Sequence, residues 1–280
     1  MRADLFAQHA ALEERHWWFQ GRTAIIADLV DQLAAGRPAE IVDVGCGTGA
    51  LVRRLAPHHR VIGFDPSPDA VALARQLGGP GVQVERATTI DEMRPALAHA
   101  RIVLLMDVLE HLRDDFFVAS ELVAAMAPGA MLIVTVPADP ALWSSHDIAF
   151  AHYRRYTRVR LQQLWAGLPV TTRLVSPLNR RLRPLVRMVR GLHRRRWRSP
   201  AGHSDLTLPI RPVNTLLRHI FASERIDLMQ ALSLGMTELP GAGVSWLTVL
   251  QREYGSCLVR TRPAGIAADQ HDPDARHVAA

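Results

Sequence analysis

Five short apolar runs alternate with helical patterns between residues 40 and 137, and this alternation constrains the fold more than any other feature. The runs cover residues 40–45, 60–65, 81–86, 101–107 and 130–137. The run at 40–45 ends in glycines and is typical of a buried parallel strand, and the run at 101–107 is strongly apolar. Helical patterns follow at 50–58, 68–78 and 114–127, whereas 87–99 is less regular. The alternation predicts an α/β fold, with a doubly wound sheet and helices on both faces.

Length and composition allow one large domain, or one domain with a smaller appendage. The 280 residues are 48% hydrophobic and 21% charged, which is ordinary for a globular protein with a sizeable core. Two cysteines, Cys46 and Cys257, do not make a disulfide framework. The first residues lack the apolar segment of a signal peptide, and no run reaches the roughly 18 apolar residues of a membrane span. We therefore expect a cytoplasmic protein, and leave contact with the inner membrane surface open.

The loop in VDVGCGTG (42–49), after the first strand, is the first candidate binding site. Its glycines, Gly45, Gly47 and Gly49, let the backbone approach a ligand closely and adopt positive φ angles. The following helix directs free N–H groups toward an anion, and Asp43 can accept hydrogen bonds from a cationic amine. With Ala50, the first two glycines also match a dinucleotide-binding fingerprint. The loop alone therefore leaves the cofactor open.

Polar side chains also follow the second and fourth strands. Asp65 ends the second strand, where a carboxylate can accept hydrogen bonds from both hydroxyls of a ribose. The stretch LLMDVLEHLRDD (104–115) puts Asp107, Glu110 and His111 just after the fourth strand. Because ligands bind at the carboxyl ends of the strands in such sheets, we expect these side chains at one site.

Four stretches of the chain resemble the class I S-adenosylmethionine-dependent methyltransferases in their order and spacing. They are VDVGCGTG (42–49), VIGFDPSPDAV (61–71), LMDVLEHL (105–112) and APGAMLIVTVP (127–137). The resemblance covers about residues 13–176 and extends to a final strand in GVSWLTVL (243–250). It implies a Rossmann-like, seven-stranded sheet with an N-terminal lid helix and a helical insertion before the last strand. The implied cofactor is S-adenosyl-L-methionine.

A bacterial subgroup of this superfamily is similar in three further stretches. They are EERHWWF (13–19), SSHDIAFAHYRRYT (144–157) and SDLTLP (204–209). Members of this subgroup are often associated with envelope-glycan or specialised-metabolite pathways. Because a fold does not determine a substrate, the resemblance leaves the acceptor open.

The resemblance implies a set of cofactor-binding residues at the strand ends. Those expected around the methionine part are Asp43, Gly45, Cys46, Gly47 and Gly49; Asp65 would hold the ribose, Pro66 and Ser67 would lie beside the adenine, and Met106, Asp107 and Val108 would line the sulfonium side. Many members have an acidic residue after the third strand that meets the adenine amine. This chain has Arg86 and Ala87 there, so that contact stays unassigned.

The stretch EERHWWFQGR (13–22) precedes the first strand, where class I methyltransferases often place a lid. Charges on both flanks argue against an aromatic membrane belt. We expect Trp17, Trp18 and Phe19 to exclude water from the sulfonium, and both tryptophans to contact the substrate. Filling of the core by one tryptophan is the alternative. Arg22 is expected to meet the cofactor carboxylate.

Histidines after the fourth and fifth strands are the candidate bases, because imidazole accepts a proton near neutral pH. We expect His111 and His146 to be catalytic, with His152 as an alternative base, and His152 and Tyr153 to contact the acceptor. A structural hydrogen bond is the alternative for each histidine.

A metal site is a second interpretation of the same region. Asp107, Glu110 and His111, with His146 as a fourth ligand, are similar to a metal-binding pattern of some quinone and RNA methyltransferases. Those relatives usually carry Glu at the first position, and acidic residues at a helix start have an ordinary dipole explanation. We therefore expect no metal.

Residues 178–198 carry nine arginines. Apolar residues recur there at spacings of three and four, which predicts one apolar helical face: Leu178, Leu182, Leu185, Val189 and Leu192. Pro184 is expected to perturb this helix near its start. A solvated cover, an anionic membrane surface and an acidic substrate are the alternatives for the arginines. Nucleic acid is not expected, because aromatic residues are not interleaved with the charges.

These observations lead us to expect a methyltransferase that acts on an oxygen of a small-molecule, glycan or lipid-linked acceptor in a biosynthetic pathway. The alternatives are an NAD-dependent oxidoreductase with the same glycine loop and a non-catalytic, membrane-peripheral scaffold. The expected organisation is lid helices (1–38), a cofactor-binding core (39–177), a basic helical insertion (178–240), the final strand (241–262) and a disordered tail (263–280). The oligomeric state stays open.

Overall fold

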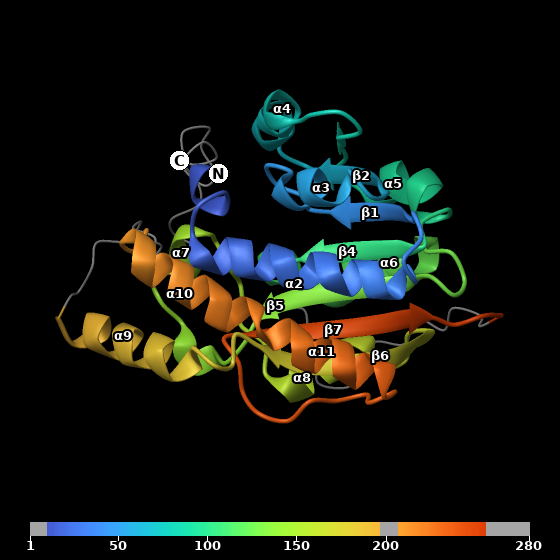
Figure 1. The fold of residues 1–280 in the computed structure, drawn as a ribbon. Coiled ribbons are helices and arrows are strands. Elements are labelled where there is room, and N and C mark those ends of the chain that lie inside the picture. The colour runs from blue at the N-terminus through green and yellow to red at the C-terminus, as the bar shows by residue number, and fades with distance from the viewer. Residues whose placement is uncertain (1–9, 197–206, 256–280) are drawn as a thin grey trace.

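The computed structural model describes residues 10–196 and 207–255 (Figure 1). The expected disordered tail lies outside these residues. No helix in the described part of the chain is long and apolar enough to cross a membrane.

A seven-stranded sheet with the order β3-β2-β1-β4-β5-β7-β6 forms the centre of the described chain. Its strands are β1 (Glu40–Val44), β2 (Arg60–Asp65), β3 (Gln83–Arg86), β4 (Ile102–Met106), β5 (Met131–Pro137), β6 (Val170–Leu178) and β7 (Ser245–Arg252). The first five strands pair in parallel, and β7 runs antiparallel between β5 and β6. The expected Rossmann-like, seven-stranded fold is confirmed.

Helices cover both faces of this sheet (Figure 1). One face packs against α2 (Trp17–Leu33), α3 (Ala50–Leu55), α4 (Pro68–Leu77), α10 (Arg211–Ala222) and α11 (Glu224–Ser233). The other face packs against α5 (Ile90–Leu97), α6 (Asp115–Ala125) and α8 (Arg158–Trp165). In β4, Ile102 and Leu104 belong to the first core, and Val103 and Leu105 to the second. Burial on both faces explains why this strand is continuously apolar in the sequence.

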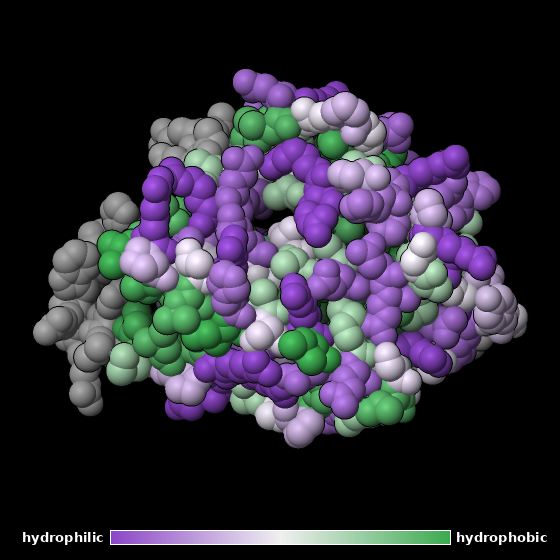
Figure 2. Space-filling model, in the orientation of Figure 1, coloured by the Kyte–Doolittle hydropathy of each residue, from purple (hydrophilic) through white to green (hydrophobic). Residues whose placement is uncertain are grey.

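Shorter elements lie at the carboxyl end of the sheet and beside it. They are the 3₁₀ turns η1 (Leu109–His111) and η2 (Pro140–Leu142), the short helix α7 (Ser145–Ala149), and α9 (Arg183–Arg196), which projects at one side of the molecule in Figure 1. Figure 2 shows apolar surface gathered at this side, over α9 and α10.

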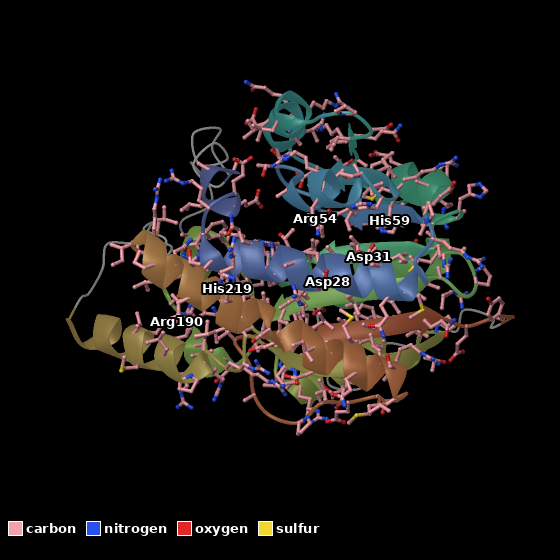
Figure 3. All side chains as sticks on the ribbon, in the orientation of Figure 1. Asp28, Asp31, Arg54, His59, Arg190 and His219 are labelled. Atoms are coloured by element: carbon pink, nitrogen blue, oxygen red, sulfur yellow. The ribbon has the colours of Figure 1, made fainter. Side chains whose placement is uncertain are left out.

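The helix α2 is fixed to the sheet at both ends. Near its C-terminal end, Asp31 accepts a hydrogen bond from Nε2 of His59 at 2.9 Å, and Figure 3 labels both residues. Nδ1 of the same ring accepts a hydrogen bond from the backbone N–H of Ala39. The imidazole of His59, which lies just before β2, thus joins α2 to Ala39, which lies just before β1.

The less regular segment 87–99 contains a helix. Residues 90–97 form α5 even though Pro95 lies inside it; Thr89 accepts a hydrogen bond from the N–H of Glu92 and caps the helix. Residues 211–233 form two helices, α10 and α11, which meet at Ser223.

The arginine-rich helix also differs from its prediction. Leu178 ends strand β6, so the helix begins five residues later. Pro184 then falls in the first turn, where a missing N–H costs no helical hydrogen bond, and it does not perturb the helix.

A glycine in α2 allows the close approach of α10. A Cβ atom built on Gly21 would lie 2.7 Å from Cδ1 of Phe221. The Phe221 ring is fully buried and contacts Trp17 edge-on, with 6.1 Å between ring centroids. The ring therefore has little room to move, and the helix crossing depends on a glycine at this position.

We expect Gly21→Ala to lower the free energy of unfolding by about 1–3 kcal/mol, because overpacking against Phe221 outweighs the better helix propensity of alanine. Urea denaturation measures the difference. Gly191→Ala in α9 is the matched control, since nothing lies within 4 Å of the added Cβ. Gly191→Ala should leave the free energy of unfolding unchanged or raise it. Equal stability of the two variants would contradict this explanation of Gly21.

Candidate active site

A cavity of about 730 Å³ lies at the carboxyl ends of the central parallel strands. Its walls come from the loops after β1, β2 and β4, the start of α2, the α7 segment, and helices α9 and α10. The predicted site residues found in these walls are Trp17, Trp18, Arg22, Asp43, Gly45, Cys46, Gly47, Asp65, Pro66, Met106, Asp107, Val108, His111, His146 and His152. Three predicted residues, Gly49, Ser67 and Tyr153, are not among the lining residues.

Each of these three residues has another structural role. Gly49 is the N-cap of α3 at φ +76°, and Ser67 caps α4 by accepting a hydrogen bond from the N–H of Ala70. Tyr153 is partly exposed and lies beside Arg113, whose guanidinium carbon is 5.6 Å from the ring centroid. The direct substrate contact expected of Tyr153 is not supported by this position.

Backbone geometry explains two glycines of the first loop. Gly45 has φ +75°, and a Cβ built on it would lie 2.5 Å from Cγ2 of Val108. Gly47 has φ +55°, and nothing lies within 4 Å of its built Cβ. The first glycine therefore lets the β1 and β4 loops touch. The second faces open space in the cavity wall and lets a ligand approach the backbone.

The carboxylate of Asp65 holds this loop in place from the end of β2. It accepts hydrogen bonds from the N–H of Gly47 and the N–H of Ser67, both at 2.9 Å. Burial raises the pKa of Asp65, and the two backbone hydrogen bonds oppose that change. The same carboxylate thus orders the loop and lines the cavity.

Asp43 is a buried carboxylate in the cavity wall with one oxygen that lacks a hydrogen-bond partner. The residue is 2% exposed, and its Oδ1 atom has no hydrogen-bond partner. Burial raises its pKa to about 7, against the favourable charge of Arg22. Because buried polar atoms are normally hydrogen-bonded, this oxygen fits the role of an acceptor for a ligand amine.

The start of α2 closes the cavity over the ends of β1 and β4. Arg22 forms an ion pair with Asp107, and its guanidinium carbon lies 4.5 Å from the centroid of the Trp18 ring. Asp107 has φ +55° and accepts a second hydrogen bond, from Oγ1 of Thr135 at 3.0 Å. Upstream, the carboxylate of Glu13 accepts a hydrogen bond from Oγ1 of Thr48 in the glycine loop. The N-terminal segment therefore covers the site through polar contacts as well as aromatic side chains.

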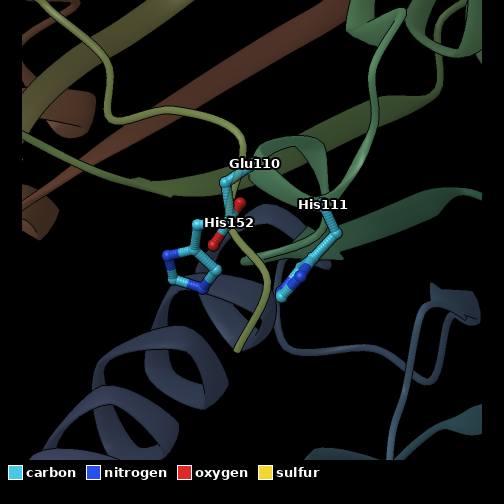
Figure 4. Close-up of side chains that lie close together, drawn as sticks. All are labelled: Glu110, His111 and His152. Carbon is cyan, nitrogen blue, oxygen red and sulfur yellow. The ribbon is translucent and has the colours of Figure 1, made fainter. Parts of the chain in front are cut away.

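Three histidines and Glu110 meet on the opposite wall. The rings of His111 and His152 are 4.7 Å apart and nearly perpendicular, and His146 lies 5.9 Å from His152. Figure 4 shows Glu110, His111 and His152 close together. Burial and the nearby His152 lower the pKa of His111 to about 4 and that of His146 to about 3. Both rings are therefore neutral at neutral pH and bind a proton weakly.

Asp147 is a buried anion behind His152. It accepts a hydrogen bond from Nδ1 of His152 at 3.0 Å and two from Arg155 at 2.8 and 3.0 Å. The N–H of Ser144 donates another at 2.8 Å. Burial alone would raise the pKa of Asp147, but these hydrogen bonds hold it well below the ordinary value. The arrangement fixes the proton of His152 on Nδ1 and leaves Nε2 as a hydrogen-bond acceptor.

The structure changes the set of side chains that could hold a metal. Three possible ligand atoms lie within 4.8 Å of one another, one each from Glu110, His111 and His152. Asp107, the first residue of the expected pattern, is instead bound to Arg22 and Thr135. Burial raises the pKa of Glu110 to about 8, so this carboxyl is protonated at neutral pH in the absence of a cation. The three side chains could be ligands of a cation, but nothing in their geometry requires one.

Sequence reasoning missed Asp147, Arg155 and the α9 residues of the cavity wall. The dipeptide that contains Arg155 looks like part of a basic surface, yet both of its arginines are buried. A capping box at Ser144 and Asp147 was a local signal for α7. No local signal marks Asp147 as the partner of His152, because that contact depends on the path of the whole loop.

Comparison with known proteins identifies the family. A family model described as "Methyltransferase domain" matches residues 18–172. The chain belongs to this family. The resemblance to class I S-adenosylmethionine-dependent methyltransferases is thereby confirmed, and the seven-stranded Rossmann-like sheet agrees with it.

Individual relatives cover only part of the chain. It is 36% identical to a ubiquinone biosynthesis O-methyltransferase of Hahella chejuensis over 109 residues, which are 38% of this chain and 46% of the relative. It is 34% identical to a trans-aconitate 2-methyltransferase of Methylobacterium nodulans over 122 residues, which are 41% of this chain and 45% of that relative. The chain thus spans less than half the length of each relative.

A solved structure extends the similarity of the fold. A chain in the complex between the Haloferax volcanii Trm112 methyltransferase activator and a methyltransferase covers 91% of this chain and 96% of its own length. The TM-score is 0.52 and the sequence identity 15%, so this likeness shows the fold alone.

The pKa of Asp43 near 7 predicts that ligand binding depends on pH. We expect ionised Asp43 to attract the ammonium group of S-adenosylhomocysteine, and protonated Asp43 not to. Lowering the pH from about 8 to about 6 should therefore weaken this affinity about tenfold, as the ionised fraction falls. Isothermal titration calorimetry measures the change.

Two controls isolate the contribution of Asp43. Asp43→Asn should bind S-adenosylhomocysteine more weakly at high pH and show a flatter pH dependence. Methylthioadenosine, which lacks the amino acid part, should bind the natural protein with little change over the same range. A pH-independent affinity for S-adenosylhomocysteine would disprove the role given to Asp43.

Proposed function

We propose that the protein transfers a methyl group from S-adenosyl-L-methionine to an oxygen of a small-molecule or lipid-linked acceptor. One observation carries the proposal: a single cavity joins the unpartnered oxygen of Asp43 on one wall to the Asp147-supported His152 on the other. The first feature suits a cationic cofactor, and the second suits removal of a proton from an acceptor.

We call the side of the cavity that carries Glu13, Asp43, Gly47 and Asp65 the cofactor wall. Its residues fit S-adenosyl-L-methionine in charge and shape. When bound, this cofactor supplies an electrophilic methyl group on a sulfonium. Glu13, Asp43 and Asp65 line the wall and complement its positive charge, while Gly47 leaves the backbone open to it. Asp43 would accept hydrogen bonds from the amine, and Asp65 from the ribose. Trp17 and Trp18 would exclude water.

We assign the base to His152 in place of the expected His111 and His146. All three histidines line the cavity, but burial makes the latter two weak bases. The ring of His152 is hydrogen-bonded through Nδ1 to a carboxylate, at 3.0 Å. That carboxylate, Asp147, stabilises the imidazolium that forms when Nε2 takes a proton.

The reaction then needs few protein groups. The acceptor hydroxyl would donate its proton to Nε2 of His152, and its oxygen would take the methyl group as the sulfur–methyl bond breaks. S-adenosylhomocysteine, a neutral thioether, would be the leaving group. Positive charge moves onto the imidazole ring, where Asp147 offsets it. His111 and His146 stay neutral and shape the pocket around the acceptor, and the closed N-terminal segment keeps water away.

The general class of acceptor in this proposal, a small molecule, is supported by the relatives. One is named for O-methylation in ubiquinone biosynthesis and the other for methylation of trans-aconitate, which are different acceptors. A cavity of about 730 Å³ has the size of small-ligand sites, and it extends from the glycine loop to α9. These two relatives are methyltransferases, which favours the methyltransferase interpretation over the nicotinamide alternative.

Calorimetry tests the cofactor. The natural protein should bind S-adenosylhomocysteine and not NAD. Asp65→Ala should weaken that binding by about 1–3 kcal/mol, because both the ribose acceptor and the support of the glycine loop are lost. Ser67→Ala, which removes only the α4 cap, is the matched control and should retain affinity. Binding of NAD, or unchanged affinity in Asp65→Ala, would count against the assignment.

Transfer of a labelled methyl group tests the base. The probe is methyl-tritiated S-adenosyl-L-methionine with a panel of phenols, hydroxy acids and polyprenyl-linked sugars. On an acceptor that is methylated, His152→Gln should lower the maximal rate by about 10²–10⁴-fold and leave affinity for S-adenosylhomocysteine unchanged. His111→Gln and His146→Gln should have smaller effects. A panel without any methylated product, or a larger loss in either control variant, would contradict the proposal.

A further inference from the structure

Exposed apolar side chains gather on two helices at the mouth of the cavity. Figure 2 shows this surface over α9 and α10. Its members are large, apolar and exposed by 40–70%: Leu185, Met188 and Val189 on α9, and Leu208, Ile210, Val213 and Leu216 on or just before α10. We call these seven residues the apolar face. Monomeric proteins rarely leave so many large apolar side chains together in water, so the face needs an occupant.

The helical spacing shows that the face is built into both helices. On α9 the residues recur at intervals of three and four, and on α10 Val213 and Leu216 are three apart. Such spacing puts the side chains of each helix on one side. Two separate helices thus offer apolar residues at the same cavity mouth.

The segment of sequence that carries the apolar face is strongly basic. Residues 178–222 contain eleven arginines and a single acidic residue, Asp205. Some arginines are engaged within the protein: Arg183 binds Asp139, and Arg181 binds Asp227. Arg187 on α9 and Arg211 at the start of α10 are exposed. Guanidinium groups beside exposed apolar residues complement phosphate headgroups over acyl chains.

We propose that the apolar face docks on an anionic lipid bilayer. The apolar side chains enter the boundary between headgroups and acyl chains, and Arg187 and Arg211 bind the phosphates. Spanning the bilayer is not required, and the contact is that of a peripheral protein. The membrane contact considered as one alternative for residues 178–198 is thereby extended to α10 and to the segment from Leu208.

The apolar face is continuous with the cavity wall. Leu185 and Val189 belong to both, and Leu217 of α10 lines the same cavity. An acceptor with a long apolar chain could therefore pass from the bilayer into the cavity without crossing water. This consequence rests on the proposed methyl transfer, whereas the docking itself does not.

Flotation with lipid vesicles tests the docking. The natural protein should float with phosphatidylcholine vesicles that contain about 30% phosphatidylglycerol, and much less with phosphatidylcholine alone. Raising the salt concentration to about 0.5 M should weaken the binding, because the headgroup charges are screened. Absence of flotation with the anionic vesicles would overturn the proposal.

Variants locate the contact. Met188→Glu, Ile210→Glu and Leu216→Glu change residues that do not line the cavity, and each should reduce vesicle binding about tenfold or more. Phe117→Glu on α6 and Val159→Glu on α8 change equally exposed residues on the opposite face of the sheet and should bind as the natural protein does. Arg187→Glu and Arg211→Glu should weaken binding, and Arg173→Glu on β6 should not. Equal binding by the two sets of variants would refute the assignment of the surface.

Two further measurements separate the outcomes. Calorimetry with S-adenosylhomocysteine should give the same affinity for the α9 and α10 variants as for the natural protein, which shows that they fold and that the cofactor site is intact. Light scattering without vesicles should give a monomer. A dimer that Met188→Glu dissociates would show that the apolar face is a subunit interface, and would overturn the lipid proposal. If vesicle binding is found without cofactor binding, the proposed function fails and the docking surface stands.

Discussion

The reversal of strand order between β1 and β4 is the constraint on which the rest of the site depends. From β1 the sheet grows toward β2 and β3 on one side, and toward β4 and β5 on the other. The loops after β1 and β4 therefore leave the sheet in divergent directions and open a crevice between them. Val108 touches the position of Gly45 at the bottom of this crevice, so the two loops meet only because one residue has no side chain.

The two walls of the crevice differ in how their buried carboxylates are compensated. Asp43 lies on the wall proposed for the cofactor, and Asp147 lies behind the wall proposed for the acceptor. On the cofactor wall, carboxylates are buried without full compensation, and the pKa of Asp43 rises to about 7. A buried carboxylate with a free oxygen is costly, and a cationic ligand removes that cost. On the acceptor wall, Asp147 is fully compensated by Arg155, His152 and a backbone N–H. The first wall is suited to binding a charge, and the second to holding one imidazole in a fixed orientation and tautomer.

Much of the fold could be predicted because its determinants are local. Strand β4 is recognisable since burial on both faces requires an unbroken apolar run. The helix α5 was expected only as a less regular segment, although Thr89 and Glu92 carry a capping signal. Helices α10 and α11 meet at Ser223, and there α10 packs on α2 while α11 packs on both α2 and β6.

The sequence by itself determined the class of fold, the order of the strands along the chain, and the residues at their carboxyl ends, including Asp43, Asp65 and Asp107. Those features depend on side-chain period and on glycines, which act over a few residues. Tertiary structure alone decided which histidine faces a carboxylate, because the Asp147–His152 contact requires a loop anchored by buried Arg155. It also decided that arginine-rich α9 and the distant α10 share one cavity mouth. Partners and burial arise from segments far apart in the chain, so no local pattern encodes them.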